Sequence, residues 1–443
     1  MRDYPSIGIQ IPDILLPNET IDLSKWSVIA CDQFTSQPEY WDKVMKVVNQ
    51  SPSTLNLILP EIYLGKPEEQ SLIDSISQTM RDYFEKKVIK PVEGMVLVER
   101  ISNAGTRHGL LLALDLEKYD FEKGSSSIIR ATEGTIIDRL PPRIRIRENA
   151  ILELPHILVL IDDPEKRVIE PLWNYISNFP KIYDFDLMLG SGHLKGYLVN
   201  NVNIEKKMVK ALEKFTKPDY FHNKYGLTNK EEILLFAVGD GNHSLATAKA
   251  VWNKKKTSLP ADHPLRYALV EIENIHDPGL IFEPIHRVIF GIKKNIIDAL
   301  RNHFGENAHL ITCPSYQEMI SIVKQSNSQK QLIGLTKSNF FGILIVDHSS
   351  SNLPVGTLQE FLDGFLTNDG TEGIDYIHGA ESLLEISQKP DNFGLYLPAM
   401  DKNELFRTVI LDGSLPRKTF SMGEAKDKRF YLECRKIQDI KKK

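Results

Sequence analysis

The chain has 443 residues, of which 42% are hydrophobic and 26% charged, as in an ordinary soluble protein. Lys and Arg total 54 against 59 Asp and Glu, and this net charge of −5 argues against a general nucleic-acid binder, because phosphate backbones require a basic surplus. The three cysteines lie far apart, which excludes a disulfide framework and a paired-cysteine metal site. No apolar run spans a bilayer and the N-terminus lacks a signal-peptide pattern, so we expect a cytoplasmic protein that binds neither membranes nor nucleic acid.

Helical and strand patterns alternate along the chain. Apolar residues recur at helical spacing within 41–48, 72–84 and 292–304, and a charged helical excursion is expected at 201–230. Short apolar runs predict strands at 95–99, 110–114, 157–161, 233–238, 267–272, 341–346, 393–397 and 429–433. This alternation predicts a mixed α/β (α+β) architecture. Changes in composition near 127 and 290 predict an N-terminal lobe at 1–127, a central lobe at 128–290 and a C-terminal lobe at 291–443.

The first candidate site is the sequence GDGNHS at 239–244, which follows a buried apolar run and precedes a helical pattern. Glycines at such a strand–turn–helix junction let the backbone approach a ligand, and the helix N-terminus favours an anion. Asp240 is a candidate Mg²⁺ ligand or proton acceptor, and His243 is a candidate phosphate contact. An ordinary turn with Asn242 or Ser244 as the helix cap explains the same residues.

The second candidate is an arginine-rich segment at 130–147. Arg143, Arg145 and Arg147 alternate with isoleucines, and a strand would place their guanidiniums on one face, where like charges require an anionic partner. A solvated edge strand, or a helix in which the charges spread out, accounts for the same spacing. Glu133 lies among the arginines as either a functional carboxylate or half of an ordinary ion pair.

Two later segments carry adjacent cations. His286 and Arg287 follow Pro284 and can both donate to a phosphate or carboxylate, whereas the alternative is a structured surface loop. Arg417 and Lys418 form a further candidate anion cradle. The sequence contains no Walker A motif, dinucleotide glycine fingerprint, protein-kinase motif pair, GxSxG or HExxH, so the common nucleotide-binding, serine-hydrolase and zinc-protease classes lack their motifs.

At these residues the chain resembles the domain of unknown function family 1015. The segments that carry this resemblance are ACDQFTS at 30–36, RATE at 130–133, GDGNH at 239–243, PIHR at 284–287, YIHG at 376–379 and PRKT at 416–419. The chain is also distantly similar to free-serine kinases of the ParB/sulfiredoxin-like fold, which have a Glu base in a first element and an Asp-Gly-His-His-Arg turn in a second. Glu133 with Arg139, and the turn that begins at Asp240, are the corresponding positions. Asn242 replaces a His of that pattern and Ser244 replaces its Arg.

The resemblance implies a central ParB/sulfiredoxin-like lobe and a phosphotransferase that converts free L-serine to O-phospho-L-serine with Mg²⁺. It implies pyrophosphate as the donor, with a nucleotide as the alternative. Glu133, Asp240 and His243 would be catalytic, with Glu133 as the base and Asp240 as the metal ligand. The residues expected to bind substrate or phosphate are Arg130, Thr132, Arg139, Arg143, Gly241, Asn242, Ser244, His286, Arg287, Arg417 and Lys418.

Other classes of function remain open at this stage. A phosphomonoester hydrolase acting on phosphoserine would use the same anion site, with water in place of the serine hydroxyl. A ParB-like nucleotide- or DNA-binding module without turnover is a second alternative, and the net charge counts against DNA. A scaffold protein is the third, and the gathering of Glu, Asp, His and Arg at predicted turns counts against it.

Overall fold

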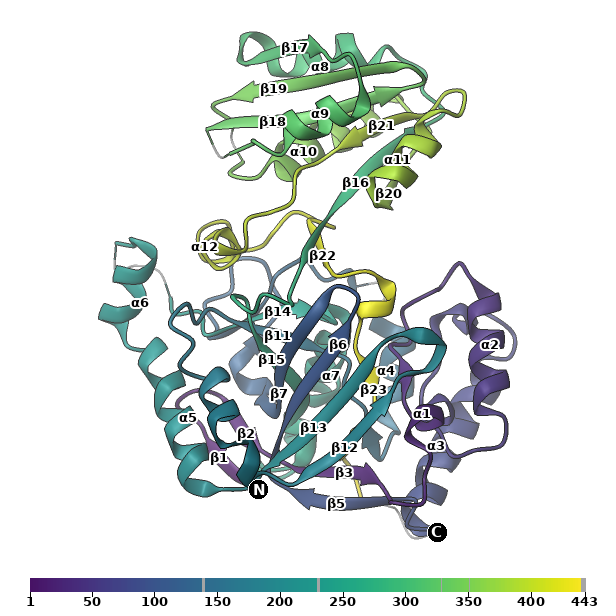
Figure 1. Ribbon diagram of the computed structural model, residues 1–443, viewed down its shortest axis with the longest axis vertical. Helices are drawn as coiled ribbons and strands as arrows, with labels where there is room; N and C mark the ends of the chain where they lie inside the picture. Colours follow the sequence, from purple (N-terminus) through teal and green to yellow (C-terminus); the bar gives the residue numbers. More distant parts are fainter. Residues whose placement is uncertain (138–139, 229–231, 328, 350, 440–443) are drawn as a thin grey trace. The chain divides into compact units, whose positions relative to one another are not determined.

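The computed structural model describes residues 1–137, 140–228, 232–327, 329–349 and 351–439. The chain forms two compact units, Met1–Ile281 with Ala425–Lys443 and Phe282–Glu424. Both combine helices with β-sheets (Figure 1), so the predicted mixed α/β architecture is confirmed. Within the described ranges, every helix falls short of the length or the apolar character that a bilayer crossing requires.

This division differs from the three expected lobes. Strand β7 (Gly105–Asp115), from the expected N-terminal lobe, pairs with β15 (Tyr267–Asn274) of the expected central lobe. Paired strands share one sheet, so the change in composition near 127 reflects a surface segment that lies between strands of the same unit. Strand β16 (Phe282–Phe290) belongs to the second unit, and the residues from Ala425 onward belong to the first.

The main sheet of the first unit has the strand order β12-β13-β6-β7-β15-β11-β14-β9-β8, and β1 and β2 join it through β7. The remaining strands of this unit are β1 (Arg2–Tyr4), β2 (Ile9–Ile11), β3 (Asp13–Pro17), β4 (Val28–Ile29), β5 (Ile89–Glu93), β6 (Met95–Ser102), β8 (Tyr119–Asp120), β9 (Ile129–Ala131), β10 (Leu152–Glu153), β11 (Leu158–Ile161), β12 (Lys181–Asp186), β13 (His193–Val199), β14 (Phe236–Asp240), β23 (Phe430–Tyr431) and β24 (Arg435–Lys436). Its α-helices are α1 (Leu23–Trp26), α2 (Pro38–Val48), α3 (Glu69–Glu85), α4 (Leu140–Glu148), α5 (Val202–Phe215), α6 (Pro218–Tyr225) and α7 (Asn242–Lys255).

Burial follows the apolar patterns of the sequence. The predicted strand at 110–114 is buried at every position within β7, as expected for a strand covered on both faces. Helix α3 buries Ile73, Ile76, Met80 and Tyr83, which share one face at helical spacing. The main sheet and the helices around it therefore enclose one large hydrophobic core.

Three strands of the main sheet place polar segments at one edge. β9 and β14 are parallel neighbours, with Ala131 opposite Val238, so their carboxyl ends meet at the same edge. β11 is antiparallel to β14 and begins there, with Leu158 opposite Asp240. We call this region the β14 edge and define it as residues 132–136, 156 and 240–244.

The second unit contains a sheet with the order β17-β19-β18-β21-β16-β20, and β22 pairs with β16. Its other elements are β17 (Ala308–Thr312), β18 (Lys330–Lys337), β19 (Phe340–Asp347), β20 (Gly373–His378), β21 (Phe393–Tyr396), β22 (Phe420–Met422), α8 (Ile296–Phe304), α9 (Tyr316–Val323), α10 (Pro354–Thr367), α11 (Ala380–Ser387) and α12 (Lys402–Asp412). Met319, Val323 and Leu332 are among the buried residues of its core.

The loop after β15 approaches the backbone of β7 closely at Gly279. A Cβ atom at Gly279 would lie 2.0 Å from the carbonyl oxygen of Thr106, so the loop and the strand would have to separate. We expect Gly279→Ala to cost about 1–3 kcal/mol and to lower the melting temperature in calorimetry. Gly364→Ala in α10 is the matched control, because its Cβ would meet nothing within 4 Å. Equal melting temperatures for the two variants would contradict the close approach.

Candidate active site

The turn between β14 and α7 is built around a glycine. Gly241 has φ +79°, in the left-handed region, and a Cβ there would lie 3.1 Å from Ile157. Gly241 also occupies the N-cap position of α7, and no side chain caps this end of the helix. The sequence-based alternative in which Asn242 or Ser244 caps the helix is therefore wrong.

Asp240, the last residue of β14, is paired with a lysine from the C-terminal segment. Its Oδ2 accepts a hydrogen bond from Lys428 Nζ at 2.9 Å, and its Oδ1 accepts one from the backbone N–H of Gly241 at 2.8 Å. Burial alone would raise the pKa of the Asp240 carboxyl. Lys428, His156 and the Gly241 N–H outweigh that effect, so the pKa lies below 3.8. Asp240 is therefore ionised at neutral pH.

Two contacts tie the segment after β9 to the start of α7. Asn242 Nδ2 lies 3.5 Å from Thr132 Oγ1, and the backbone N–H of Ile136 donates to His243 Nε2 at 3.3 Å. Glu133 lies within this segment and is partly buried. The structure thus brings Glu133, Thr132, Asn242 and His243 to the same edge as the β14 turn.

A chain of hydrogen bonds leads from this turn into the interior. His156 Nε2 lies 2.9 Å from Ser244 Oγ, and its Nδ1 lies 2.8 Å from the hydroxyl of Tyr431. That hydroxyl donates to Cys31 Sγ at 3.1 Å. The Tyr431 oxygen then accepts a hydrogen bond from His156 Nδ1–H. This leaves His156 Nε2 to accept a hydrogen bond from the Ser244 hydroxyl. Burial raises the pKa of the Cys31 thiol to about 12, so this series of hydrogen bonds ends at a protonated thiol.

The ACDQFTS segment reaches this region through Cys31. The backbone N–H of Glu61 donates to the carbonyl oxygen of Cys31 at 2.8 Å, and Arg143 forms an ion pair with the Glu61 carboxylate. Arg143 lies on α4, so residues 140–148 form the helix that was one of the sequence alternatives, and the strand with three aligned guanidiniums does not form. The other two arginines of that helix, Arg145 and Arg147, pair with glutamates of their own.

The structure commits Arg130 to the backbone. Arg130 is buried, its Nε donates to the carbonyl oxygen of Ser127 at 2.7 Å, and its Nη2 donates to that of Glu232 at 2.8 Å. Its guanidinium thereby holds the segment before β14. Arg139, a further predicted phosphate contact, lies outside the described residues.

Four predicted binding residues belong to the second unit. Arg287 is fully buried in β16, where its guanidinium donates to the carbonyl oxygens of Arg417 at 2.9 Å and Lys418 at 3.0 Å. His286 Nδ1 accepts from the backbone N–H of Leu397 at 3.1 Å, and burial lowers the pKa of His286 to about 3. His286 and Arg287 thus lie in a buried strand and not in the surface loop that was the sequence-based alternative.

Sequence reasoning did not single out Lys428, His156, Tyr431 or Cys31 as site residues. The apolar run predicted at 429–433 signalled a strand there, and the ACDQFTS segment was noted only for its resemblance. These side chains come from segments far apart in the chain, and only the order of strands in the sheet brings them together.

Asp240 offers one carboxylate to a metal ion. Among the described residues, no group of three or more His, Cys, Asp or Glu side chains is arranged to hold one. Magnesium at phosphoryl-transfer sites takes one or two carboxylates, with phosphate oxygens and waters as its other ligands. The residues at the β14 edge therefore fit a Mg²⁺ ion that arrives with a polyphosphate, and they do not form a metal cage of their own.

The fold and the β14 edge define a mixed α/β protein with a lysine-paired carboxylate at a strand–turn–helix junction. The chain belongs to the family described as Protein of unknown function (DUF1015), whose model matches residues 15–365. This membership confirms the resemblance seen in the sequence. No curated protein matches the sequence.

Several solved structures are similar to the chain at low identity. A free serine kinase in complex with AMP is 11% identical, with a TM-score of 0.37 over 74% of this chain and 91% of that one. A conserved hypothetical protein from Pyrococcus furiosus is 11% identical, with a TM-score of 0.34 over 73% and 90% of the two chains. SbnI with C-terminal truncation from Staphylococcus aureus is 12% identical, with a TM-score of 0.34 over 70% and 81%. The family assignment rests on the family model alone.

The Asp240–Lys428 pair makes a prediction for stability against pH. A carboxyl whose pKa is lowered on folding stabilises the folded state above its unfolded pKa, and this contribution is lost as the pH falls through the folded pKa. We expect Lys428→Met to reduce the free energy of unfolding by about 2 kcal/mol at neutral pH, with the deficit shrinking below about pH 4. Urea denaturation at several pH values across this range measures the deficit in the free energy of unfolding. The double variant Asp240→Asn/Lys428→Met is the control and should recover part of the loss, whereas a pH-independent deficit would contradict the pairing.

Proposed function

We propose that this protein is a small-molecule kinase that phosphorylates the hydroxyl of free L-serine with pyrophosphate as the donor. The observation that carries the proposal is the parallel pairing of β9 with β14, by which Glu133 and Asp240 share one edge of the sheet. Phosphoryl transfer requires positioned reactants, a carboxylate for the hydroxyl proton and positive charge around the phosphates. The choice of L-serine rests on the sequence resemblance to free-serine kinases.

Glu133 is the general base in this proposal. The serine oxygen attacks one phosphorus of pyrophosphate, the bridging P–O bond breaks, inorganic phosphate leaves, and the hydroxyl proton passes to the Glu133 carboxylate. Thr132 supports this position because its hydroxyl donates to the carbonyl oxygen of Val238 at 2.6 Å and is itself fully buried. The base is thus attached to a segment that β14 holds in place.

Positive charge at the edge comes from Lys428 and the first turn of α7. Lys428 keeps Asp240 ionised, and its ammonium lies beside the carboxylate that would hold Mg²⁺. Mg²⁺, when bound, neutralises charge on the donor phosphates. Asn242 and His243 begin α7, where the helix dipole and backbone N–H groups favour a phosphoryl group.

We choose pyrophosphate as the donor because it requires no pocket for a base or a ribose. It has neither base nor ribose, and the sequence has no nucleotide-binding motif. Of the predicted phosphate-binding arginines, Arg130 donates to backbone carbonyls and Arg143 pairs with Glu61. We therefore assign the phosphate contacts to Lys428 and α7 in preference to these arginines.

Phosphorus NMR tests the reaction and the donor together. The purified chain is incubated with L-serine, Mg²⁺ and, in turn, pyrophosphate, ADP and ATP. We expect O-phospho-L-serine with pyrophosphate and none when Mg²⁺ is removed by chelation. Equal or faster turnover with ATP would overturn the choice of pyrophosphate as the donor but would leave the proposed kinase activity intact. Release of phosphate from phosphoserine without any donor would support the hydrolase alternative.

Replacement of Glu133 by Gln tests the base. Gln keeps the size and hydrogen-bonding capacity of the side chain but cannot take a proton, and loss of a general base costs on the order of 10²–10⁴-fold in rate. Glu19→Gln is the matched control, because Glu19 is exposed and forms an ordinary surface ion pair with Lys90. A Glu133→Gln variant that retains more than about a tenth of the wild-type turnover would exclude Glu133 as the base.

A further inference from the structure

Ser244 lies in the first turn of α7, but its hydroxyl takes no part in holding that turn together. The backbone N–H of Ser244 donates to the carbonyl oxygen of Gly241 at 3.0 Å, and no side chain caps the helix. A hydroxyl within a helix commonly donates to the carbonyl oxygen four residues earlier, as Thr247 does to His243 at 2.7 Å. The Ser244 hydroxyl lies instead 2.9 Å from Nε2 of His156, in the segment before β11.

The hydrogen bonds of His156 leave its Nε2 able to take a proton. Burial raises the pKa of the Tyr431 hydroxyl well above its usual value, so Tyr431 keeps its proton at neutral pH. That proton is donated to Cys31 Sγ, and the Tyr431 oxygen also accepts the backbone N–H of Cys31 at 3.3 Å. Because its one proton is committed, the Tyr431 oxygen can only accept from His156, which places the imidazole proton on Nδ1. Nε2 is therefore a proton acceptor directed at the Ser244 hydroxyl.

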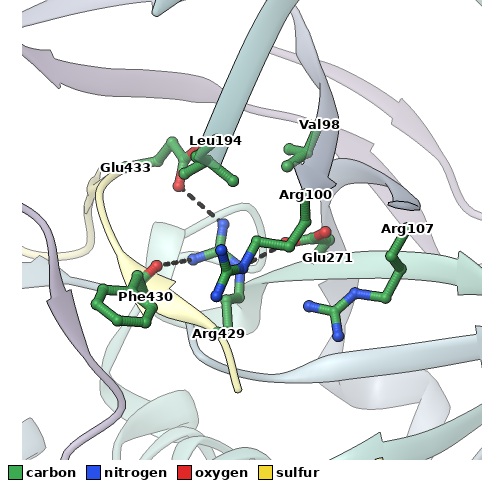
Figure 2. Close-up of a pocket in the computed structure, with 8 residues that line it drawn as sticks. All are labelled: Val98, Arg100, Arg107, Leu194, Glu271, Arg429, Phe430 and Glu433. Atoms are coloured by element: carbon green, nitrogen blue, oxygen red, sulfur yellow. Dashed lines mark hydrogen bonds and ion pairs between the residues drawn. The ribbon is translucent and has the colours of Figure 1, made fainter. Parts of the chain in front are cut away.

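A buried arginine holds the two segments that carry His156 and Tyr431. Arg429 Nη1 donates to the carbonyl oxygen of Pro155, the residue before His156, at 2.6 Å. Figure 2 shows the other donors of Arg429 directed at two carboxylates, which they reach at 2.6 and 2.8 Å. Tyr431 follows Arg429 by two positions, and its ring meets that of His156 edge to face with 5.4 Å between centroids. One buried anchor thus fixes the imidazole relative to the group that orients it.

These contacts have the arrangement of an activated nucleophile, in which a hydroxyl is bonded to a base and a third group orients the base. We propose that Ser244 is a nucleophile that accepts a phosphoryl group when free L-serine is absent. The Ser244 oxygen attacks one phosphorus of pyrophosphate, the bridging P–O bond breaks, inorganic phosphate leaves, and the hydroxyl proton passes to His156 Nε2. The donor in this self-phosphorylation rests on the function proposed above, whereas the nucleophile rests on the contacts of Ser244 itself.

The surroundings of Ser244 suit phosphoryl transfer better than acyl transfer. Ser244 is the third residue of α7, where the helix dipole favours the negative oxygens of a phosphoryl group. Lys428 places an ammonium beside Asp240, four residues before Ser244. The sequence lacks the GxSxG motif of the common serine acyl hydrolases. Ser244 is partly exposed, so a ligand can reach its hydroxyl, which is the same chemical group as the hydroxyl of free L-serine.

Mass spectrometry of the full chain tests the self-phosphorylation. The protein is incubated with Mg²⁺ and pyrophosphate but without L-serine, and the modified peptide is sequenced. We expect one phosphoryl group on Ser244, none in Ser244→Ala, and labelling at least about 10²-fold slower in His156→Gln, because Gln cannot take the proton. Ser258→Ala is the matched control and should label like the wild type, because Ser258 is exposed and donates to the carbonyl oxygen of Lys255 at 2.9 Å. A phosphoryl group on another residue would overturn the proposal.

A small fluorophosphonate separates the nucleophile from the donor, because the probe carries its own leaving group. Attack by Ser244 forms the new P–O bond, fluoride leaves, and the hydroxyl proton passes to His156. We expect the probe to modify Ser244 in the wild type and to fail in His156→Gln. Modification by the probe but not by pyrophosphate would overturn the self-phosphorylation, and phosphoserine formed from L-serine in the same mixture would show that the proposed function survives. Absence of both modifications would overturn Ser244 as a nucleophile, whether or not L-serine is phosphorylated.

Nitrogen-15 NMR tests Tyr431 as the residue that positions His156. Tyr431→Phe keeps the edge-to-face ring contact but removes the oxygen that accepts the Nδ1–H. In mildly alkaline buffer we expect the wild-type imidazole to carry its proton on Nδ1, and the variant to show both tautomers together with slower modification of Ser244. A proton on Nε2 in the wild type would overturn this part of the proposal. Circular dichroism checks that each variant folds.

Discussion

The buried guanidinium of Arg429 holds the C-terminal segment against the main sheet. It lies between the carboxylates of Glu271 and Glu433, and its remaining donors reach backbone carbonyls. A charge buried this completely requires hydrogen-bond partners, and these contacts give a partner to each of the three guanidinium nitrogens. Lys428 precedes this anchor and Tyr431 follows it by two positions, so the same contact delivers both side chains to the β14 edge.

The local pattern of the sequence predicts most of the elements but not the contacts between them. Periodicity predicts α3 and the strands β7 and β15, and the GDGNHS segment predicts the turn after β14. Asp240 and Lys428, however, are 188 positions apart, and Ser244 and His156 are 88 apart. Such pairs depend on strand order, in particular on the return of the C-terminal segment to the first unit, and no local pattern encodes that order.

The arginines also show that a local sequence pattern does not reveal which side chains contact each other. A run of arginines in the sequence suggested a phosphate clamp, yet Arg143, Arg145 and Arg147 lie on one helix and each is paired with a glutamate. Arg100 and Arg107 attracted no notice, because each lies in a strand whose other residues are mostly apolar and belongs to no run of arginines. Only their register, which places them opposite each other in the sheet, makes them conspicuous.

Two carboxyls of the first unit, the partly buried Asp240 and the fully buried Glu273, respond to pH in opposite ways, because their neighbours differ. Cations outweigh burial around Asp240 and lower its pKa, so its contribution to stability is lost in acid. Burial and other carboxylates outweigh the arginines around Glu273, so its contribution is lost as the pH rises toward about 8. The Asp240 carboxyl at the β14 edge is therefore charged at neutral pH, whereas the Glu273 carboxyl is mostly protonated there. One sheet thus holds two carboxyls in opposite charge states at neutral pH, because the residues packed around each of them differ.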